Sequence, residues 1–448
     1  MIDLISPSSF WSRTWLQLAA VFVVAFVLRA FFVLHYGPIL TNDSTYYLSV
    51  AEGIQQGKGL GLPYRSPPLY PLFLALIHSV CSSHWAIIWV QAVVGALTCV
   101  VLAATCRRLF QPKLAFVLGL AATWYIPMAA FCVTVLRETI IGFGISLATY
   151  CLVRSLQEQG IRWCWITGAA GAFTLFNQAT FVFFPFWVGI AYWIHARSFK
   201  SALRRILPVI VCYAIAVGSW TARNYHVTGR VIPLSADHIG YFLLEGIMDA
   251  NKEAKALTPE QIRFLGIAED DPYNTYAGMR DQYWGLGEAE GTGGLERKLK
   301  DGPVLFSRAV RLALHEPGRY LRFSLQRLHR LWFKDIWVER MEDNYINLRP
   351  LDRLRATHNV AALALIMAIY AFGYSSLIGM VVYWRPLLGL LVPVVTMLTF
   401  HAWVHAETRY ALAIHPHLLI FSLLAVIFVW QRLIQRKPTQ EIRLAVLK

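Results

Sequence analysis

Residues 86–106 read AIIWVQAVVGALTCVVLAATC, and Arg107 and Arg108 follow directly. A helix needs about twenty mostly apolar residues to cross the hydrocarbon core of a bilayer, and this stretch has that length without a charged side chain. The chain holds further apolar runs of similar character. They lie at residues 15–36, 114–133, 138–154, 164–179, 180–196, 206–222, 357–383, 386–404 and 410–431. The sequence therefore predicts an all-α polytopic membrane protein with about ten transmembrane helices.

The composition supports a membrane protein and argues against nucleic-acid binding. Of the 448 residues, 57% are hydrophobic and 15% are charged, whereas soluble domains carry about 25% charged residues. The formal net charge of +15 comes from lysines and arginines in short clusters between apolar runs, a pattern typical of membrane topology and lipid headgroup contacts. The sequence contains no nucleic-acid-binding motif. The seven cysteines are odd in number and lack CxxC spacing, so neither a disulfide framework nor a zinc knuckle is expected.

The basic loops predict the orientation of the chain. Residues 68–80 are apolar but number only about thirteen, so they are expected to lie at the interface or to re-enter, not to span. With the N-terminus inside, the basic clusters then fall on the inner side, as the positive-inside rule requires. These clusters are Arg107–Arg108 with Lys113, Arg154 with Arg162, Arg197 to Arg205, Arg385, and the tail from Arg432 to Lys437. Counting residues 68–80 as a span would place these clusters outside.

Three regions follow from this orientation. Residues 1–222 form an N-terminal membrane domain, whose first apolar run lacks signal-peptide features and is expected to remain as an anchor. Residues 223–356 form an extracytoplasmic segment, and residues 357–448 form the C-terminal membrane helices with a cytoplasmic tail. Residues 302–332 repeat apolar side chains at helical spacing among arginines. This spacing predicts a small helical domain resting on the membrane, with a break between two helices at Glu316-Pro317-Gly318.

Asp43 is the first candidate for chemistry. It follows the first apolar run directly, in Thr41-Asn42-Asp43, and opens an expected helix over residues 44–56. An aspartate at such a position is often a helix N-cap. A short carboxylate at the membrane exit also suits a general base near an acceptor hydroxyl. The pattern of residues leaves both interpretations open.

Two outer turns hold the other candidates. Arg137 and Glu138 lie between two apolar runs, where charged residues at membrane depth usually have a partner or a function, although such a pair can also simply end a helix. The turn WVHAETRY (403–410) contains Glu407 and Arg409. Arg409 suits an anionic phosphate, and its alternative role is to snorkel toward water. His401 and His405 share a helix face and could bind a metal, but no third ligand stands at a defined spacing.

Short motifs occur in a fixed order along the chain. The outer loop with Asp43 contains YRSPPLYPLFLAL (64–76), and the acidic turn at Glu138 comes next. They are followed by WTARN (220–224) with Gly229 and Pro233-Leu234-Ser235, and by Glu407-x-Arg409-Tyr410 with Pro416. This order resembles the GT-C superfamily of polyprenyl-phosphate-sugar glycosyltransferases. It is most similar to the bacterial relatives of protein O-mannosyltransferases and of lipid A aminoarabinose transferases, over nearly the whole chain.

The resemblance implies a role for each matching position. Asp43 matches the family's first-loop acidic residue, the proposed catalytic base, and Glu138 matches the acidic residue of the second outer loop. Arg65 to Leu69 match the family's basic-Pro-Pro-Leu stretch beneath the site. Arg223-Asn224 match the Arg-Asn that closes the span before the insert. Arg409-Tyr410 match the Arg-Tyr late in the family's sequence.

The sequence also departs from the family at three places. Eukaryotic mannosyltransferases have a paired Asp-Glu in the first loop, where this chain has Asn42-Asp43. The first proline after the Arg-Tyr is Ala413 here, although Pro416 is kept. Many relatives have Arg-Pro near residues 177–180, where this chain has Asn177-Gln178, so the sugar cannot be inferred from close relatives.

The implied reaction is the transfer of a sugar from a polyprenyl-phosphate carrier to a hydroxyl of a lipid, glycan or protein acceptor, with inversion at the anomeric carbon. Polyprenyl phosphate is a good leaving group, so one base and a set of cations are sufficient, unlike glycoside hydrolysis. Asp43 is the expected base, and Arg409, Arg223 and either Arg65 or Lys58 are the expected phosphate ligands. No cofactor is certain, and the resemblance leaves a divalent metal open. The expected location is a bacterial inner (plasma) membrane, with the site on the periplasmic or extracellular side.

Two other functions remain to be weighed. A membrane transporter would place charges in mid-span and show two matching halves with broken helices, whereas the charges here lie at one face beside a single large insert. A non-catalytic component of envelope assembly would keep the fold without a working base. Loss of function on Asp43→Asn with normal folding would argue against that second alternative.

Overall fold

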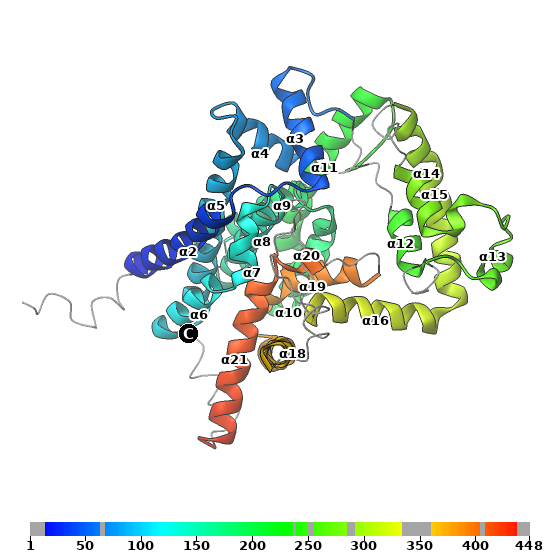
Figure 1. Ribbon diagram of the computed structural model, residues 1–448. Helices are drawn as coiled ribbons and strands as arrows, with labels where there is room; N and C mark the ends of the chain where they lie inside the picture. Colours follow the sequence, from blue (N-terminus) through cyan, green and yellow to red (C-terminus); the bar gives the residue numbers. More distant parts are fainter. Residues whose placement is uncertain are drawn as a thin grey trace, which may run out of the picture.

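The computed structural model describes residues 14–62, 68–158, 160–235, 239–248, 255–284, 292–333, 360–403 and 408–436. Over these residues the chain is almost entirely helical (Figure 1). Its β-type pairings within these ranges are two isolated bridges, Ile39 with Thr134 and Ala256 with Thr275. The predicted all-α fold class is confirmed.

Six stretches of the described chain are long and apolar enough to cross a membrane. They are α2 (Thr14–Tyr36), α5 (His84–Leu109), α8 (Glu138–Gln157), the continuous η2 (Ala179–Phe183) and α10 (Phe184–Ala196), α11 (Phe199–Thr228), and α21 (His415–Leu433). A seventh is formed if α6 (Pro112–Thr123) is joined to α7 (Ile126–Ala130) and η1 (Phe131–Val133), which bend by 55° at Trp124-Tyr125. Pro127 follows that break, and a proline near the start of α7 suits a new helix and not the continuation of α6.

The expected number of about ten spans is not confirmed, because three of the predicted runs are not among these stretches of the described chain. α9 (Arg162–Leu175) has 14 residues, a length of about 21 Å at about 1.5 Å per residue. α19 (Leu388–Trp403) has 16 residues and contains Pro393. In α18 (Val360–Tyr383) the described apolar part is Met367–Tyr383. Figure 1 shows α18 end-on while α21 is seen along its length, so these two neighbouring helices cross.

The first outer loop contains two helices that do not span. α3 (Asn42–Gln55) packs on α4 (Leu69–His78), which has ten residues and is too short to cross, as predicted for residues 68–80. Between them, Gly57, Gly59 and Gly61 have φ angles of 74°, 71° and 63°. Such left-handed conformations are accessible to glycine at little cost, so these three residues end α3 and turn the chain.

Basic side chains gather at the end of the bundle opposite the first outer loop. Glu158 lies 2.5 Å from Arg154 and 3.3 Å from Arg162, and Arg108 is within 3.8 Å of the same carboxylate. Arg205 donates to the Glu158 backbone carbonyl at 3.3 Å. The loops that the positive-inside rule assigns to one side therefore do meet at one end of the helices.

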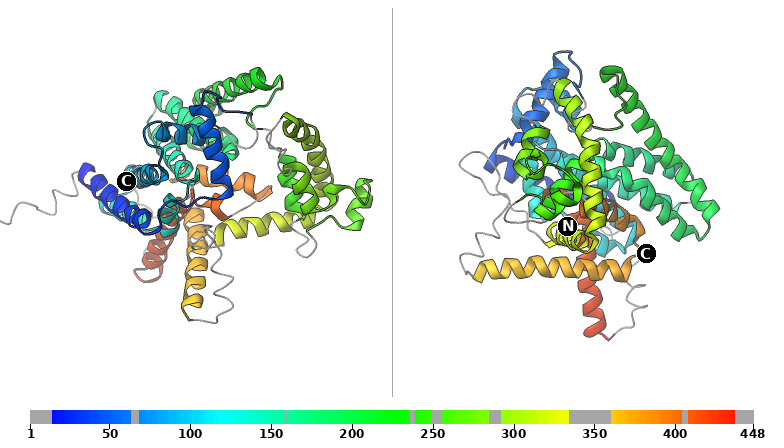
Figure 2. Two further views of the ribbon diagram at one scale, coloured as in Figure 1. Left: turned by 45° about the horizontal axis from the view of Figure 1, so that its top comes forward. Right: turned by 90° about the vertical axis from the view of Figure 1, so that its right-hand side faces the viewer.

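The large insert forms a separate helical unit beside the bundle (Figures 1 and 2). Its helices are α12 (Ile239–Met248), α13 (Pro259–Leu265), η3 (Pro272–Asn274), α14 (Tyr276–Trp284), α15 (Thr292–His315) and α16 (Pro317–Phe333). The predicted break at Glu316 is confirmed, because α15 ends at His315 and α16 begins at Pro317. The unit has its own core of buried residues, including Tyr241, Leu244 and Leu312. α11 continues to Thr228, past the boundary expected at residue 222.

α16 attaches this unit to the bundle. The Trp332 Nε1 donates to the Gly373 carbonyl at 3.1 Å and to the Ser376 hydroxyl at 2.9 Å, both in α18. Arg327 is buried and donates to the carbonyls of Gly246 in α12 at 2.5 Å and Ala402 in α19 at 3.4 Å. One arginine thus joins the insert to the helix that leads into the last outer turn.

The crossing of α18 and α21 depends on Gly379. A Cβ at this position would lie 1.9 Å from the Phe421 carbonyl oxygen, a backbone atom that cannot move alone. Gly379→Ala should therefore push the helices apart and lower the melting temperature of the purified protein by several degrees, since overpacking typically costs about 1–3 kcal/mol. Gly218→Ala is the matched control, because nothing lies within 4 Å of its Cβ and alanine favours a helix. Equal melting temperatures for the two variants would contradict the close crossing.

Candidate functional site

Three charged residues from distant parts of the chain meet at the outer end of the bundle. The Arg409 Nη1 donates to the Asp43 Oδ2 at 2.8 Å, and the Arg409 Nε lies 4.0 Å from the Glu138 Oε1. Asp43 comes from α3, Glu138 begins α8, and Arg409 lies in the short helix α20 (Thr408–Ala411). The site is therefore assembled only when the first, second and last outer loops come together.

The local structure of α3 frees the Asp43 carboxylate for this contact. Thr41 is the N-cap: its hydroxyl accepts from the Ser44 backbone N–H at 3.3 Å, and the Ser44 hydroxyl accepts from the Thr41 N–H at 2.9 Å. This reciprocal pair is a capping box and satisfies the helix start without Asp43. The N-cap interpretation of Asp43 is therefore wrong. Its carboxylate lies in the first turn, where the helix dipole favours a negative charge.

Backbone pairing holds the first two outer loops side by side. The Ile39 N–H donates to the Val133 carbonyl at 2.9 Å, and the Val135 N–H donates to the Ile39 carbonyl at 3.0 Å. Ile39 lies four residues before Asp43, and Val135 lies three residues before Glu138. This short parallel bridge therefore fixes how far apart the two carboxylates can lie.

A network of buried side chains forms hydrogen bonds to the backbone of that bridge. The Gln91 Nε2 donates to the carbonyls of Cys132 and Thr134, both at 2.8 Å, and the Tyr70 hydroxyl donates to the Gln91 Oε1 at 2.9 Å. Sequence reasoning did not single out Gln91 or Tyr70. A signal was present, because Gln91 is the one amide side chain within the apolar run 86–106 and a buried amide needs partners.

Glu138 is the most buried member of the site. Its side chain is 7% exposed, and its Oε2 has no hydrogen-bond partner among the described residues. A buried carboxylate without full pairing costs free energy, so its presence beside Arg409 calls for a functional reason or an absent ligand. The neighbouring Arg137 Nη1 donates to the Asn177 carbonyl at 3.0 Å and so ties this turn to the one after α9.

The ion pair contributes little to stability by itself. The side chain of Asp43 is 41% exposed and that of Arg409 is 24% exposed. Partly exposed pairs are typically worth about 0–1 kcal/mol. The three groups are two carboxylates and one guanidinium. Asp43 is accessible to solvent, whereas Glu138 is buried. Such a site offers an accessible carboxylate with a fixed guanidinium beside it.

Arg223 lies in another part of the outer face. Its Nη2 donates to the Gly61 carbonyl at 2.6 Å, and its guanidinium stacks over Trp220 at 5.0 Å. It therefore anchors the glycine-rich loop, which also carries the exposed Lys58. The structure gives no contact between Arg223 or Lys58 and the three charged residues, as far as the described side chains go.

The structure describes the other predicted site residues only in part. Arg65, His405 and Glu407 lie outside the described residues, as does the side chain of Tyr410. His401 is buried at the end of α19. Over the ranges that the structure describes, no group of three or more His, Cys, Asp or Glu side chains could hold a metal ion.

Part of the chain is similar to a known family. Residues 65–220 match the profile of the family described as dolichyl-phosphate-mannose-protein mannosyltransferase. This match covers about a third of the chain and includes Glu138, whereas Asp43 and Arg409 lie outside it. No protein of curated function matches the chain.

Solved structures are similar over nearly the whole chain. An oligosaccharyltransferase of Archaeoglobus fulgidus, tethered to an acceptor peptide with the NVT sequon, has a TM-score of 0.51 and 12% identity, covering 95% of this chain and 51% of its own. Its complex with Zn and sulfate has a TM-score of 0.50 and 11% identity, covering 96% and 50%. ArnT from Cupriavidus metallidurans bound to undecaprenyl phosphate has a TM-score of 0.41 and 13% identity, covering 94% and 80%.

The chain therefore shares the fold of the archaeal oligosaccharyltransferase, and this fold and the family match agree with the predicted resemblance to the GT-C superfamily. It spans about half the length of the archaeal oligosaccharyltransferase.

The capping box allows the roles of Thr41 and Asp43 to be separated. Thr41→Ala should lower the free energy of unfolding by about 1 kcal/mol, the usual cost of losing an N-cap. Asp43→Asn should change it by less, because Thr41 keeps the cap and the ion pair is partly exposed. Thermal unfolding of both purified variants measures the difference. A larger loss in Asp43→Asn than in Thr41→Ala would return the capping role to Asp43.

Proposed function

We propose that this chain is a membrane glycosyltransferase that moves a sugar from a polyprenyl-phosphate carrier to an acceptor hydroxyl. The observation that carries this proposal is the contact of Arg409 with Asp43 at 2.8 Å, beside the buried Glu138. A carboxylate and a guanidinium at the end of apolar helices can meet a hydroxyl from water and a phosphate from the bilayer. We place this end on the periplasmic or extracellular side of a bacterial inner membrane, because the basic loops lie at the other end.

Asp43 is the proposed general base. Its carboxylate takes the proton of the acceptor hydroxyl as the acceptor oxygen attacks the anomeric carbon of the sugar. The bond between that carbon and the carrier phosphate breaks, and the phosphate leaves with the bonding electrons. Attack from the face opposite the leaving phosphate inverts the anomeric centre. The partial exposure of Asp43 suits this role, because an acceptor must reach it from outside.

Arg409 is the proposed phosphate ligand. A guanidinium has N–H donors in a planar fork that matches the geometry of phosphate oxygens, and the Arg409 Nη1 donates to Asp43. On this assignment the side chain orients the base and lies beside the charge that develops on the leaving phosphate. Glu138, 4.0 Å from the Arg409 Nε, holds the guanidinium from its buried side. On this assignment Glu138 positions Arg409 and does not take the proton.

An apolar cavity beside the last outer turn suits the lipid part of the donor. It has a volume of about 360 Å³ and lies between the membrane helices and the insert. Its lining includes Phe183, Leu243, Val310, Leu314 and Phe400. Phe400 lies in α19, the helix that leads to Arg409. An isoprenoid chain has no polar group to satisfy, so burial in such a lining is favourable.

The transporter alternative has one observation in its favour. The bent pair α6 and α7 is a broken apolar helix, and broken helices often line transport sites. The positions of Asp43, Glu138 and Arg409 argue against that function, because these charges meet at one end of the bundle and not in mid-span. Arg29, the buried charge nearest to mid-span, donates from its Nη1 to the Ala25 carbonyl at 3.0 Å and from its Nη2 to the Cys99 sulfur at 3.5 Å, while its Nε has no partner among the described residues.

The role of Asp43 can be tested by turnover. Asp43→Asn should lower the transfer rate by about 10²-fold or more, the usual contribution of a general base, while the protein folds normally. Glu52→Gln is the matched control, because Glu52 is an exposed acid of the same helix and its variant should keep full activity. The assay uses a panel of polyprenyl-phosphate sugars with envelope fractions as acceptors. Near-normal turnover of Asp43→Asn would rule out this base.

The role of Arg409 can be tested by product inhibition. Arg409→Lys keeps the charge but loses the planar fork, so free polyprenyl phosphate should inhibit the variant markedly less. Arg223→Lys is the matched control and should be inhibited like wild type, because the Arg223 guanidinium contacts the Gly61 carbonyl and lies apart from the three charged residues. Inhibition constants are compared with wild type. An unchanged value for Arg409→Lys would move the phosphate ligand to Arg65 or Lys58.

A further inference from the structure

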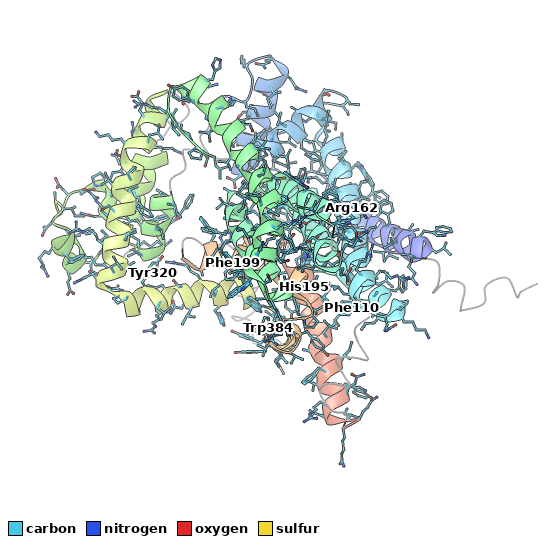
Figure 3. The ribbon with its side chains drawn as sticks, turned by 180° about the vertical axis from the view of Figure 1, so that it is seen from behind. Phe110, Arg162, His195, Phe199, Tyr320 and Trp384 are labelled. Atoms are coloured by element: carbon cyan, nitrogen blue, oxygen red, sulfur yellow. The ribbon has the colours of Figure 1, made fainter. Side chains whose placement is uncertain are left out.

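A polar cavity, distinct from the apolar cavity described above, lies at the basic end of the bundle, away from the proposed active site. It has a volume of about 530 Å³. Its lining includes Trp193, His195, Arg197, Trp384, Arg385 and Leu388, from the end of α10, the turn after α18 and the start of α19. Figure 3 labels His195 and Trp384 on these two sides. α19 runs from this cavity toward Arg409, so its 16 residues separate the two places by about 24 Å.

The charge at this cavity is strongly positive. Residues 184–208 and 380–392, which contain its lining, include no Asp or Glu. They include Lys200, Arg204 and Arg205 in addition to the two lining arginines. The acidic residue that closes this end of the bundle, Glu158, is already held by Arg154 and Arg162. Arg197 and Arg385 are exposed, and no carboxylate of the described chain lies within salt-bridge distance of either.

Arg197, which lines the cavity, has an unfavourable backbone conformation. It is the C-cap of α10, with φ 51° and ψ 21°, and its N–H donates to the Trp193 carbonyl at 2.8 Å. Glycine is the usual residue in this left-handed conformation, because a Cβ makes it unfavourable. An arginine in its place indicates that the side chain serves a purpose. On the other side of the cavity, Arg385 stacks over the Trp384 ring at 5.0 Å.

The apolar surroundings match the boundary of a bilayer. Trp193 is 55% exposed and Trp384 is 36% exposed, and tryptophan is enriched at the level of lipid headgroups. Phe186 is also exposed and lies in α10, seven residues before Trp193. This spacing places both side chains on one helix face, where acyl chains can lie below a headgroup held by the arginines.

We propose that this cavity binds the headgroup of an anionic glycerophospholipid. The phosphate lies between Arg197 and Arg385, the two tryptophans flank the glycerol region, and the acyl chains follow the exposed face of α10. A lipid fits better than a free anion, because the positive cavity continues into an apolar helix face. This proposal does not depend on the glycosyltransferase assignment.

The test measures lipid binding to the purified, delipidated full chain by native mass spectrometry. The probes are dioctanoyl-phosphatidylglycerol, dioctanoyl-phosphatidylcholine and inorganic phosphate. Wild type should bind phosphatidylglycerol in preference to phosphatidylcholine. Arg197→Ala with Arg385→Ala should weaken phosphatidylglycerol binding by tenfold or more, because each cation near a lipid surface contributes measurably to attraction.

Lys200→Ala with Arg204→Ala is the matched control. It removes the same charge from the same end of the bundle, at positions that do not line the cavity, and should weaken binding less than threefold. Arg197→Lys with Arg385→Lys keeps the charge and checks that the loss does not come from misfolding; it should bind better than the alanine variant. Equal losses in the alanine and control variants, or equal affinity for phosphatidylcholine, would overturn the proposal. Inorganic phosphate that binds as tightly as the lipid would identify a site for a free anion.

Discussion

Polar groups at the edge of a bilayer must find partners within the protein, and in this chain Arg409 meets that requirement for two carboxylates. Its guanidinium joins α20 to α3 at 2.8 Å and approaches the start of α8 at 4.0 Å. Arg409 and Asp43 are 366 residues apart in sequence. Beside this contact the buried Glu138 has both Arg409 and the adjacent Arg137 as neighbouring cations, which stabilise its charged form.

Backbone and side-chain hydrogen bonds hold the elements around that contact in place. The Ile39–Thr134 bridge sets the first loop against the second, with Gln91 beneath it. The insert reaches the last loop through Arg327, which donates to the Ala402 carbonyl next to the end of α19. The site is thus built on backbone hydrogen bonds and buried side chains, which hold catalytic geometry more precisely than exposed ion pairs do.

Part of this arrangement could be predicted from the sequence. Apolar runs and basic loops are strong signals, so the all-α class, the non-spanning residues 68–80 and the common side of Asp43, Glu138 and Arg409 follow from them. Contacts between single side chains are not encoded in such patterns. Thr41 and Asp43 can both cap a helix, and only the geometry of α3 decides between them. Arg223 was expected near the phosphate, but its partner is the Gly61 carbonyl, a backbone group that has no signature in the sequence. The span count differs at α9 and α19, with 14 and 16 residues, because a run of apolar residues does not reveal where a turn ends the helix.

The capping box at Thr41 has a consequence for how such proteins diverge. Because the helix start does not need the carboxylate at position 43, a single codon change there would leave a chain that still folds and inserts into the membrane. Natural selection on stability cannot remove such a change, and only selection on activity can. On the proposed assignment of Asp43 as the base, families with this architecture are open to inactive members that keep the shape and abundance of an enzyme without its chemistry. Detecting the protein in a cell envelope would then say nothing about whether sugar is being transferred.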